Sequence, residues 1–251
     1  MKAIILSAGF GSRLGDLTKG IPKSLVDVNG KSIIQRQIET FRNNGIKEII
    51  VIVGPHKEKF QLNDVEYVID KNFHEHEQLS SLMTASKYFQ NDIVISFGDV
   101  IVDNKIMKQI VESTYEFGIA VDLNWEKNYV SRDQHPKSEA DNVLFDKEDN
   151  VLEIKKNIQK PDSKIGEFAG IVKLSKKGSN ILSKKLNELH ALINQGLGSE
   201  AEDFNIKQSA IPDMIQELID SEINVEPIYI SGKWCEIDTP QDLQIARKLF
   251  S

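Results

Sequence analysis

The sequence predicts a doubly wound α/β fold, in which a mixed, mostly parallel β-sheet carries helices on both faces. Two apolar runs without alternation, residues 3–9 and 48–54, are typical of central parallel strands that are covered on both sides. Between them, apolar residues recur at helical spacing from Ile33 to Phe41 and stop before Gly45, a residue that suits a left-handed helix end. This strand–helix–strand order is the basic unit of a parallel sheet.

The rest of the chain continues the alternation of strands and helices. Residues 143–146 and 151–156 flank the turn-like sequence KEDN and predict a hairpin. Residues 1–251 are interpreted as a single domain, to which residues 126–175 add a smaller lobe on the acceptor side. The other expected elements are strands at 65–70, 92–98, 118–125 and 225–230, helices at 79–88, 175–194, 209–221 and from Pro240 onward, and a glycine- and acid-containing loop before residue 209.

Composition argues against several classes of function. The net charge of -7 would repel a nucleic-acid backbone, and the chain has no long basic run. The single cysteine, Cys235, excludes an intramolecular disulfide and a zinc site built from several cysteines. The sequence shows neither the pattern of a signal peptide nor an apolar run long enough to span a bilayer. We therefore expect a cytoplasmic protein without nucleic-acid or membrane partners, and no oligomeric state is predicted.

The most informative segment is residues 6–25, LSAGFGSRLGDLTKGIPKSL, where an apolar strand runs into a glycine-rich loop. Glycines such as Gly9 and Gly11 let successive backbone N–H groups point at phosphate oxygens. Arg13 can bind two of these oxygens, and Lys23 adds a compact positive charge. The segment therefore predicts a binding site for a phosphorylated ligand.

Two common glycine-loop families fail on specific residues. A dinucleotide fingerprint requires glycine where Leu14 stands and an acid at the end of the second strand, whereas Asp27 lies in a turn-like sequence. A P-loop requires lysine after its second glycine, but Ile21 follows Gly20. The spacing that remains is G-x-G-x-R followed by P-K.

This spacing resembles the sugar-phosphate nucleotidyltransferase superfamily, whose signature reads roughly L-x-A-G-x-G-x-R and then P-K-x-L-x-x-V-x-G. The matching residues are Leu6, Ala8, Gly9, Gly11, Arg13, Pro22, Lys23, Leu25, Val28 and Gly30. The resemblance extends over essentially the whole chain and implies an enzyme in which Arg13 and Lys23 are catalytic. It also implies that the nucleotide is bound by Leu6, Ala8, Gly9, Gly11, Ser12 and Arg13.

The resemblance further implies a magnesium site. In the superfamily, one aspartate follows a central strand in a G-D motif and another lies in a W-x-E-I-D segment, and here they are Asp99 and Asp238. Magnesium is usually held by one or two carboxylates together with substrate phosphates and water. Asp99 follows an apolar strand, so we expect it at the carboxyl edge of the sheet, where ligands bind in open α/β folds. Mg2+ is thus the expected cofactor.

A third cation is expected at the phosphate of the acceptor. The superfamily usually has a lysine late in the strand that here ends in Lys155 and Lys156. Because side chains alternate along a strand, only one of the two can face the site. We assign this catalytic role to Lys156, with Lys155 as the alternative.

The base-binding region favours cytidine. The P-x-G-L-A-like segment of uridylyl- and thymidylyltransferases is absent, and residues 72–86, NFHEHEQLSSLMTAS, look more like the N-S-x-x-S-L type of phosphocholine cytidylyltransferases. Gln78 offers an amide donor and acceptor, and Ser80 and Ser81 add hydroxyls that can match the edge of cytosine. Either serine can equally cap the helix that follows.

The histidines do not predict a metal site. His74 and His76 alternate within a loop and lack the i, i+4 spacing of a helical zinc motif, so a solvated loop is expected there. The remaining histidines, His56, His135 and His190, show no partner spacing.

Two further segments concern the acceptor. Residues 131–146 resemble the region before the hairpin in cytidylyltransferases for aminoethylphosphonate and similar organophosphonates, and residues 166–175 resemble the acceptor-side strand of the superfamily. We expect the acceptor to be bound by Glu167, Trp234 and Glu236, because a cationic head group needs carboxylates or aromatic faces.

The resulting hypothesis is a magnesium-dependent cytidylyltransferase. It transfers CMP from CTP to a small phosphate or phosphonate, of the 2-aminoethylphosphonate or phosphocholine type, and releases pyrophosphate. One alternative is a sugar 1-phosphate uridylyl- or thymidylyltransferase, which the missing base-binding motif disfavours. Another is a non-catalytic nucleotide-sensing module. This second alternative is disfavoured by the presence of Arg13, Lys23, Asp99 and Asp238.

Overall fold

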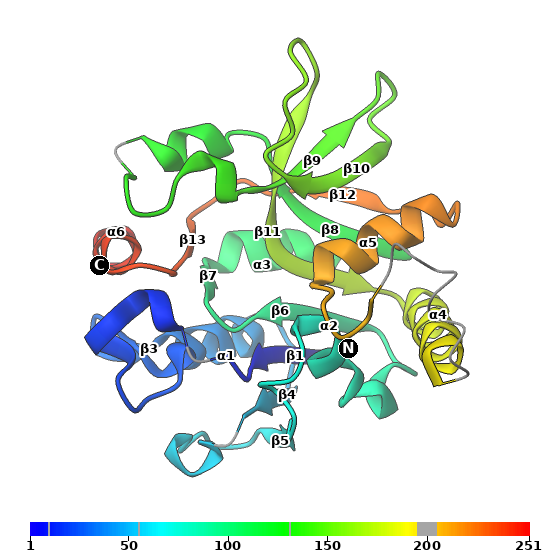
Figure 1. Ribbon diagram of the computed structural model, residues 1–251. Coiled ribbons are helices and arrows are strands. Elements are labelled where there is room, and N and C mark those ends of the chain that lie inside the picture. Colours follow the sequence, from blue (N-terminus) through cyan, green and yellow to red (C-terminus); the bar gives the residue numbers. More distant parts are fainter. Residues whose placement is uncertain (10, 55, 131, 195–204) are drawn as a thin grey trace.

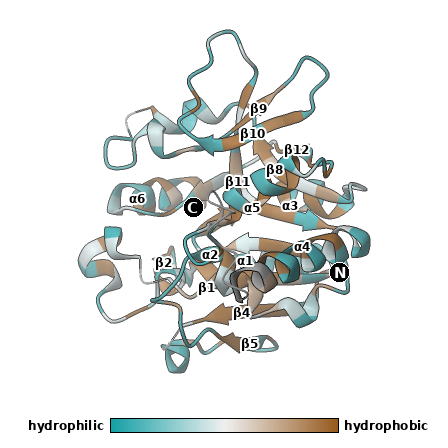
Figure 2. Cartoon of the chain, turned by 45° about the vertical axis from the view of Figure 1, so that its right-hand side comes forward, coloured by the Kyte–Doolittle hydropathy of each residue, from teal (hydrophilic) through white to brown (hydrophobic). Residues whose placement is uncertain are grey.

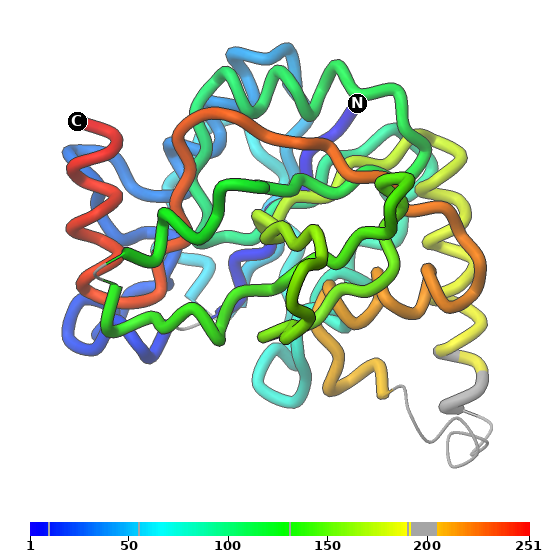
Figure 3. Tube along the Cα trace, turned by 90° about the horizontal axis from the view of Figure 1, so that it is seen from above, coloured from blue at the N-terminus to red at the C-terminus, as the bar shows by residue number. Residues whose placement is uncertain are grey.

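The computed structural model describes residues 1–9, 11–54, 56–130, 132–194 and 205–251 (Figure 1). Ser131, the first residue of the segment 131–146, lies outside the described residues. So do residues 195–204, which are part of the expected glycine- and acid-containing loop. The main sheet has nine strands in the order β10-β9-β11-β6-β1-β4-β5, and β8 and β12 join it through β11. Helices α1 and α3 lie on one side of this sheet and α4 and α5 on the other (Figure 3). The predicted fold class is confirmed.

The apolar runs near the N-terminus form the parallel half of the sheet. β1 (Lys2–Ser7) pairs in parallel with β4 (Glu48–Val53) on one side and β6 (Ile93–Phe97) on the other. β5 (Glu66–Ile69) extends the sheet beyond β4. Every residue of β6 is buried, which explains why its sequence lacks polar alternation. All four strands therefore end at the same edge of the sheet.

The second half of the sheet is mainly antiparallel. β11 (Ile165–Leu174) pairs antiparallel with β6, with β8 (Phe117–Asp122) and with β9 (Asp141–Phe145). β10 (Val151–Lys156) completes the predicted hairpin with β9, and β12 (Glu226–Tyr229) pairs in parallel with β8. Figure 1 shows β9 and β10 at the top of the molecule, on the far side from β4 and β5. This hairpin belongs to the segment 126–175, whose assignment as a separate lobe remains a prediction.

The helices follow the predicted order, with one correction. The expected helix at 79–88 is wrong in extent, because the α-helix ends at Met83 and a separate 3-10 turn covers Ser86–Tyr88. Between them the hydroxyl of Thr84 donates to the carbonyl oxygen of Ser81 at 2.6 Å, a local bond that competes with helix continuation. The helices are α1 (Ile33–Asn43), α2 (Gln78–Met83), α3 (Asn104–Glu112), α4 (Lys176–Asn194), α5 (Ile211–Asp220) and α6 (Pro240–Leu249).

The C-terminal segment returns to the N-terminal half of the molecule. β13 (Trp234–Glu236) pairs antiparallel with β7 (Val100–Val102), and the N–H of Ile237 donates to the carbonyl oxygen of Asp99 at 3.0 Å. Helix α6 begins at the Thr239 cap, as predicted, and Figure 3 shows it beside the N-terminal segment. A small second core joins them, formed by Leu14, Val26, Val28, Ile33, Ile101, Cys235, Ile237, Leu243 and Ala246. The remaining short strands, β2 (Asp27–Val28) and β3 (Lys31–Ser32), form a hairpin nearby.

Hydropathy follows this layering. Figure 2 shows hydrophobic residues concentrated on the central strands and hydrophilic ones on the loops and the outer faces of the helices. Within the described part of the chain, no helix is long and apolar enough to cross a membrane.

Candidate active site

Three segments that are distant in sequence meet at the carboxyl edge of the parallel strands. They are the glycine-rich loop after β1, the turn between β6 and β7, and the segment between β13 and α6. The approach is close, since a Cβ atom added at Gly98 would collide with the carbonyl oxygen of Leu6. Gly11 has a φ of 66°, and a Cβ there would lie 2.7 Å from the side chain of Lys23. Both positions therefore require glycine.

Lys23 links the two predicted metal ligands. Its Nζ lies 2.6 Å from Oδ2 of Asp99 and also contacts Oδ1 of Asp238. An Nη atom of Arg13 lies 2.8 Å from the same oxygen of Asp238. Burial acts to lower the pKa of Lys23, but the carboxylates of Asp99 and Asp238 outweigh it and hold this pKa above its ordinary value. The structure thus brings together two cations and two acids that were predicted from separate motifs.

Asp99 and Asp238 have the chemistry that magnesium requires. Oδ1 of Asp99 is buried and has no hydrogen-bond partner among the described residues. Asp238 is 3% exposed. Carboxylate oxygens are the hard ligands that Mg2+ prefers, and a buried carboxylate oxygen is costly unless a cation or a donor satisfies it. The two residues therefore fit a magnesium ion, and the metal assignment stays a prediction.

A buried histidine that the sequence analysis missed adjoins Asp238. His135 is 3% exposed, and its Nδ1 lies 3.6 Å from Oδ2 of Asp238 and 3.4 Å from Oδ2 of Asp242. Its Nε2 lies 3.9 Å from Oε2 of Glu236, and ligand atoms of His135, Glu236 and Asp238 all lie within 4.8 Å of one another. The sequence shows no partner spacing for His135, but the fold brings these acids to it. Because Asp242 is 107 residues further along the chain, local spacing carries no signal for this contact.

Arg132 and Asp242 support the same corner of the site. Nε of Arg132 donates to Oδ1 of Asp242 at 2.6 Å, while Oδ2 of Asp242 accepts from the backbone N–H groups of Asp238 and Thr239 at 3.1 and 2.9 Å. Burial acts to raise the pKa of Asp242, but hydrogen bonds from His135 and Arg132 hold it below its ordinary value. The charged side chain of Asp242 therefore fixes the backbone that carries Asp238.

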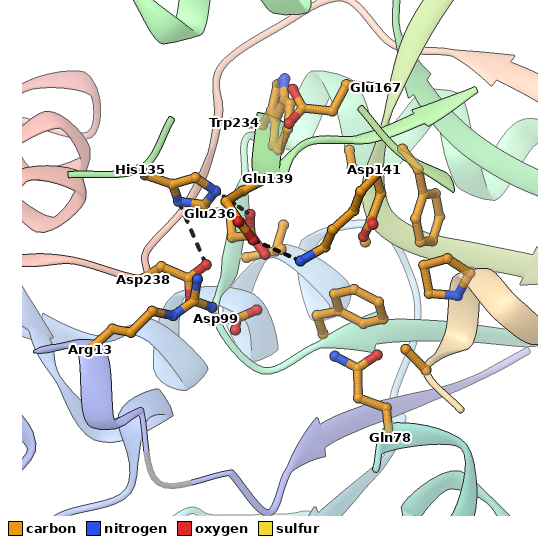
Figure 4. Close-up of a pocket in the computed structure, with 18 of the residues that line it drawn as sticks. Arg13, Gln78, Asp99, His135, Glu139, Asp141, Glu167, Trp234, Glu236 and Asp238 are labelled. Atoms are coloured by element: carbon orange, nitrogen blue, oxygen red, sulfur yellow. Dashed lines mark hydrogen bonds and ion pairs between the residues drawn. The ribbon is translucent and has the colours of Figure 1, made fainter. Parts of the chain in front are cut away.

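Two cavities adjoin at Asp99. One, termed here the loop cavity, has a volume of about 610 Å3 and is lined by Leu6, Ala8, Gly9, Gly11, Ser12, Phe73, His74, His76, Glu77, Gln78, Ser81, Phe97, Gly98 and Asp99. The other, termed the acidic cavity and drawn in Figure 4, has a volume of about 280 Å3. It is lined by Arg13, Glu77, Gln78, Phe97, Asp99, Val100, His135, Glu139, Asp141, Lys156, Glu167, Phe168, Ala169, Gly170, Ala210, Pro212, Trp234, Glu236 and Asp238.

Most of the predicted nucleotide-binding residues line the loop cavity. Gln78 lines both cavities, and Arg13 faces the acidic one. Ser80 lines neither, because its hydroxyl donates to the carbonyl oxygen of Ile206 at 3.1 Å on another face of α2. The predicted residues in the wall of the loop cavity are Leu6, Ala8, Gly9, Gly11, Ser12, Gln78 and Ser81.

The expectation of a solvated loop holds for His74 and is wrong for His76. The side chain of His74 is 62% exposed, whereas that of His76 is 10% exposed and places its Nε2 3.2 Å from Oδ1 of Asp70. Asp70 is itself 1% exposed. A buried carboxylate needs polar partners around it, and His76 contacts it. The two histidines differ because the loop folds over Asp70, which lies outside the motif.

The acidic cavity has an excess of negative charge. Among its described lining residues, the positively charged side chains are those of Arg13 and Lys156. Against them stand seven carboxylic acids, namely Glu77, Asp99, Glu139, Asp141, Glu167, Glu236 and Asp238. Burial raises the pKa of Asp141 to about 6, and burial together with the charges of Asp238 and Asp99 raises that of Glu236 well above its ordinary value. Such a cavity favours a ligand that brings positive charge.

Glu167 is the most deeply buried of the three predicted acceptor-binding residues. It is 3% exposed, and its Oε1 accepts from the hydroxyl of Tyr129. Its Oε2 is buried and has no hydrogen-bond partner within the described chain. Burial raises the pKa of Glu167 to about 8. Figure 4 shows Glu167 beside Trp234, whose Nε1 donates to Oδ2 of Asp122 at 2.8 Å.

The structure separates the two candidate lysines of β10. Nζ of Lys156 lies 2.8 Å from Oε2 of Glu139, and both side chains line the acidic cavity. Lys155 instead pairs with Glu153 and lines neither cavity. The alternation of side chains along the strand therefore selects Lys156 as the lysine that faces the site.

Two relatives with assigned activities match all or part of the chain. The CTP:phosphoglutamine cytidylyltransferase of Campylobacter jejuni is 28% identical over 256 residues, which span 98% of each chain. The choline-phosphate cytidylyltransferase of Streptococcus pneumoniae is 37% identical over 119 residues, which cover 46% of this chain and 52% of that protein.

Solved structures share the fold. The CTP:phosphocholine cytidylyltransferase of Streptococcus pneumoniae superposes with a TM-score of 0.71 at 23% identity, covering 100% of this chain and 99% of the other. The inositol-1-phosphate CTP transferase of T. maritima superposes with a TM-score of 0.72 at 18% identity, covering 99% of this chain and 95% of the other.

Residues 3–130, which carry the glycine-rich loop, Lys23 and Asp99, match the MobA-like NTP transferase domain. The match confirms the resemblance to nucleotidyltransferases drawn from the loop signature, and it spans half of the sequence. The chain therefore belongs to the family of MobA-like NTP transferase domains, and it is a nucleotidyltransferase.

Proposed function

We propose that this protein transfers CMP from CTP to a small phosphate or phosphonate acceptor that carries a positively charged end. The observation that carries the proposal is the pairing of a loop cavity of about 610 Å3 with a smaller, acid-lined cavity, the two adjoining at Asp99. The full-length relative from Campylobacter jejuni and the shorter match from Streptococcus pneumoniae, both named as cytidylyltransferases, support CTP as the donor.

The reaction needs no covalent enzyme intermediate. An oxygen of the acceptor phosphate or phosphonate attacks the α-phosphorus of CTP, the bond from that phosphorus to the oxygen bridging to the β-phosphate breaks, and pyrophosphate leaves with that oxygen. Arg13 and Lys23 offset negative charge on the triphosphate, and Lys156 binds the acceptor phosphate from the opposite cavity. Catalysis then comes from holding the two anions in line near Asp99.

Asp99 and Asp238 are the residues that would hold magnesium. The ion would supply charge neutralisation on the phosphate oxygens, which lowers the cost of bringing two anionic reactants together. Asp242 supports this arrangement by fixing the backbone of Asp238 through two N–H groups.

The acid-lined cavity supports a cationic head group on the acceptor. Oε2 of Glu167 is buried without a partner in the described chain, so an ammonium group that donates to it satisfies an otherwise costly atom and favours the ionised form of Glu167, whose pKa burial otherwise raises to about 8. The rings of Tyr129 and Trp125 are covered by the chain's own cations, since Arg132 lies 4.9 Å from the ring centre of Tyr129 and Lys137 lies 4.9 Å from that of Trp125. Trp234 lines the cavity itself, so an aromatic side chain accompanies the carboxylates there. The lining therefore supports a cationic group of either kind, a protonated amine or a quaternary ammonium.

A panel of donors and acceptors tests the proposal. Pyrophosphate release is measured with each of the four nucleoside triphosphates against aminoethylphosphonate, phosphocholine, phosphoglutamine, an uncharged hydroxyalkyl phosphonate, ribitol phosphate and glucose 1-phosphate. We expect CTP with aminoethylphosphonate or phosphocholine to give the highest kcat/KM. Preference for the uncharged phosphonate would refute the cationic head group and retain the cytidylyltransferase. Preference for UTP or dTTP with glucose 1-phosphate would establish the sugar alternative, and the absence of turnover in every combination would favour the nucleotide-sensing module.

A further inference from the structure

A buried hydrogen-bond network lies behind the wall of the loop cavity and has no part in the reaction described above. Its centre is Asp70, which is 1% exposed. Oδ2 of Asp70 accepts from the hydroxyl of Ser81 at 2.5 Å. Oδ1 accepts from the backbone N–H of Asn72 at 3.2 Å and lies 3.2 Å from Nε2 of His76. Both oxygens of the carboxylate are therefore engaged.

The bond to Asp70 decides what Ser81 can offer a ligand. A serine hydroxyl carries one proton and two lone pairs, and an ionised carboxylate can only accept hydrogen bonds. Because Ser81 gives its proton to Asp70, only its lone pairs remain for the loop cavity, which Ser81 lines. Ser81 is thus held as an acceptor on the wall that also contains His76 and Gln78.

We propose that Asp70 is a positioning residue which, by taking the proton of Ser81, makes the nucleotide site select a base with an amino group over one with a carbonyl group. This inference rests on the proposed function, in which the loop cavity holds the nucleotide. Cytosine presents its N4 amino donor where uracil presents its O4 acceptor. A serine that can only accept pairs with the amino group and opposes the carbonyl oxygen, so it discriminates CTP from UTP.

The substitution Asp70→Asn reverses the polarity of Ser81 with little change in volume. Oδ1 accepts from the backbone N–H of Asn72, which is always a donor, so the amide oxygen of asparagine is favoured at this position. Its NH2 group then faces Ser81 and donates to it. The hydroxyl proton of Ser81 is released toward the cavity, where it can pair with the O4 of uracil.

The test measures the dissociation constants of CTP and UTP by isothermal titration calorimetry in the presence of Mg2+, which needs no acceptor. We expect the wild-type protein to bind CTP more tightly and Asp70→Asn to reduce the UTP-to-CTP ratio of Kd by about tenfold or more, the effect of mispairing one buried polar group. Ser81→Ala should also reduce this ratio, mainly by weakening CTP. Ser80→Ala is the matched control, because the hydroxyl of Ser80 bonds to Ile206, and it should leave the ratio unchanged.

The outcomes separate the inference from the proposed function. A wild-type protein that binds CTP no better than UTP contradicts the cytidylyltransferase assignment and the inference together. A wild-type preference for CTP that survives in Asp70→Asn overturns the inference alone. If Asp70→Asn does not fold, as judged by circular dichroism, Asp70→Ser is used instead. The serine can donate to Ser81 as well as accept from it, so the ratio should again fall, and an unchanged ratio overturns the inference.

Discussion

The two cavities of this nucleotidyltransferase are built in different ways. The loop cavity takes much of its lining from the segments that follow β1 and β6, where Gly11 and Gly98 permit close contact between chain segments. The acidic cavity takes its character from charged side chains on the antiparallel half of the sheet and on the return segment, among them Asp141, Glu167 and Glu236. One has a wall that is rich in small residues, and the other is lined by a cluster of partly buried charged residues.

The difference predicts different responses to mutation. Substitutions at the junction of the cavities should abolish turnover with every acceptor, because both reactants depend on it. Substitutions in the acidic cavity should change the acceptor that is used and its KM while leaving CTP binding intact. A buried charge also costs stability. Substitutions that remove a charge from the acidic cavity should therefore lower activity while raising stability, and substitutions in the loop cavity should not.

The largest effect is expected at the junction. Asp99→Asn or Asp238→Asn removes a charge from the predicted metal site, and turnover should fall on the order of a thousandfold with the fold intact. The measurement is the initial rate of pyrophosphate release at limiting magnesium. Asp64→Asn, an exposed aspartate in a loop, is the control and should behave as wild type. Near-normal activity in either junction variant would remove that residue from the metal site.

The next effect concerns the cations that face the triphosphate. Lys23→Ala should reduce kcat about a hundredfold at saturating CTP, because a charge that meets the leaving pyrophosphate acts on the transition state. Arg13→Ala should lose less, since the Arg13 side chain is 57% exposed whereas that of Lys23 is 11% exposed. The measurement is the kcat of each variant at saturating CTP. Full recovery of the rate would make both residues ground-state binders only.

A smaller and more selective effect is expected on β10. Lys156→Ala should raise the KM for the acceptor about tenfold, the loss of one hydrogen bond to a charged group, and should leave the KM for CTP unchanged. Lys155→Ala is the control from the same strand, because Lys155 pairs with Glu153 and lines neither cavity. Equal effects in the two variants would refute the assignment of the acceptor phosphate to Lys156 in the acidic cavity.

The smallest change in rate is expected for Glu167→Gln, which should lower activity and raise stability. The unfolded chain loses this proton near the ordinary pKa of 4.5, whereas the folded protein keeps it up to about pH 8. The stability that Glu167 contributes is therefore fully present below pH 4.5 and is lost as the pH rises to about 8. Glutamine stays neutral, so the variant should be increasingly more stable than wild type across this range.

Thermal unfolding of both proteins at pH 5 and pH 8 checks the stability of Glu167→Gln, and the variant should also show a severalfold lower kcat/KM for a cationic acceptor. A Tm difference that does not grow with pH would contradict the raised pKa of Glu167. An unchanged preference for cationic over uncharged acceptors would show that another group binds the cation.

Sequence spacing was sufficient for the parallel half of the fold and for the glycine-rich part of the loop cavity. The residues of that part lie within a few positions of the ends of β1 and β6, whereas residues 73–81 reach the cavity from the segment that follows β5. The extent of α2 was overestimated because the bond from Thr84 to Ser81 forms within the last turn, where apolar periodicity gives no warning.

Side-chain contacts were harder to predict in both parts of the site. His135 reaches its partners Glu236, Asp238 and Asp242 only because β13 returns to pair with β7. His76 is buried because the loop folds over Asp70, and Ser80 and Ser81 differ because consecutive residues of a helix point in different directions. None of these contacts has a fixed spacing along the chain.

The chain order of glycines, arginine, lysine and apolar runs was enough to predict a nucleotidyltransferase fold and its glycine-rich loop, because backbone conformation and strand burial depend on neighbouring residues. The protonation of Glu167, the orientation of the Ser81 hydroxyl and the ion pair between Lys156 and Glu139 depend on burial and on charges brought from remote segments. Burial and Coulomb interactions act through space, so these properties followed only from the folded arrangement.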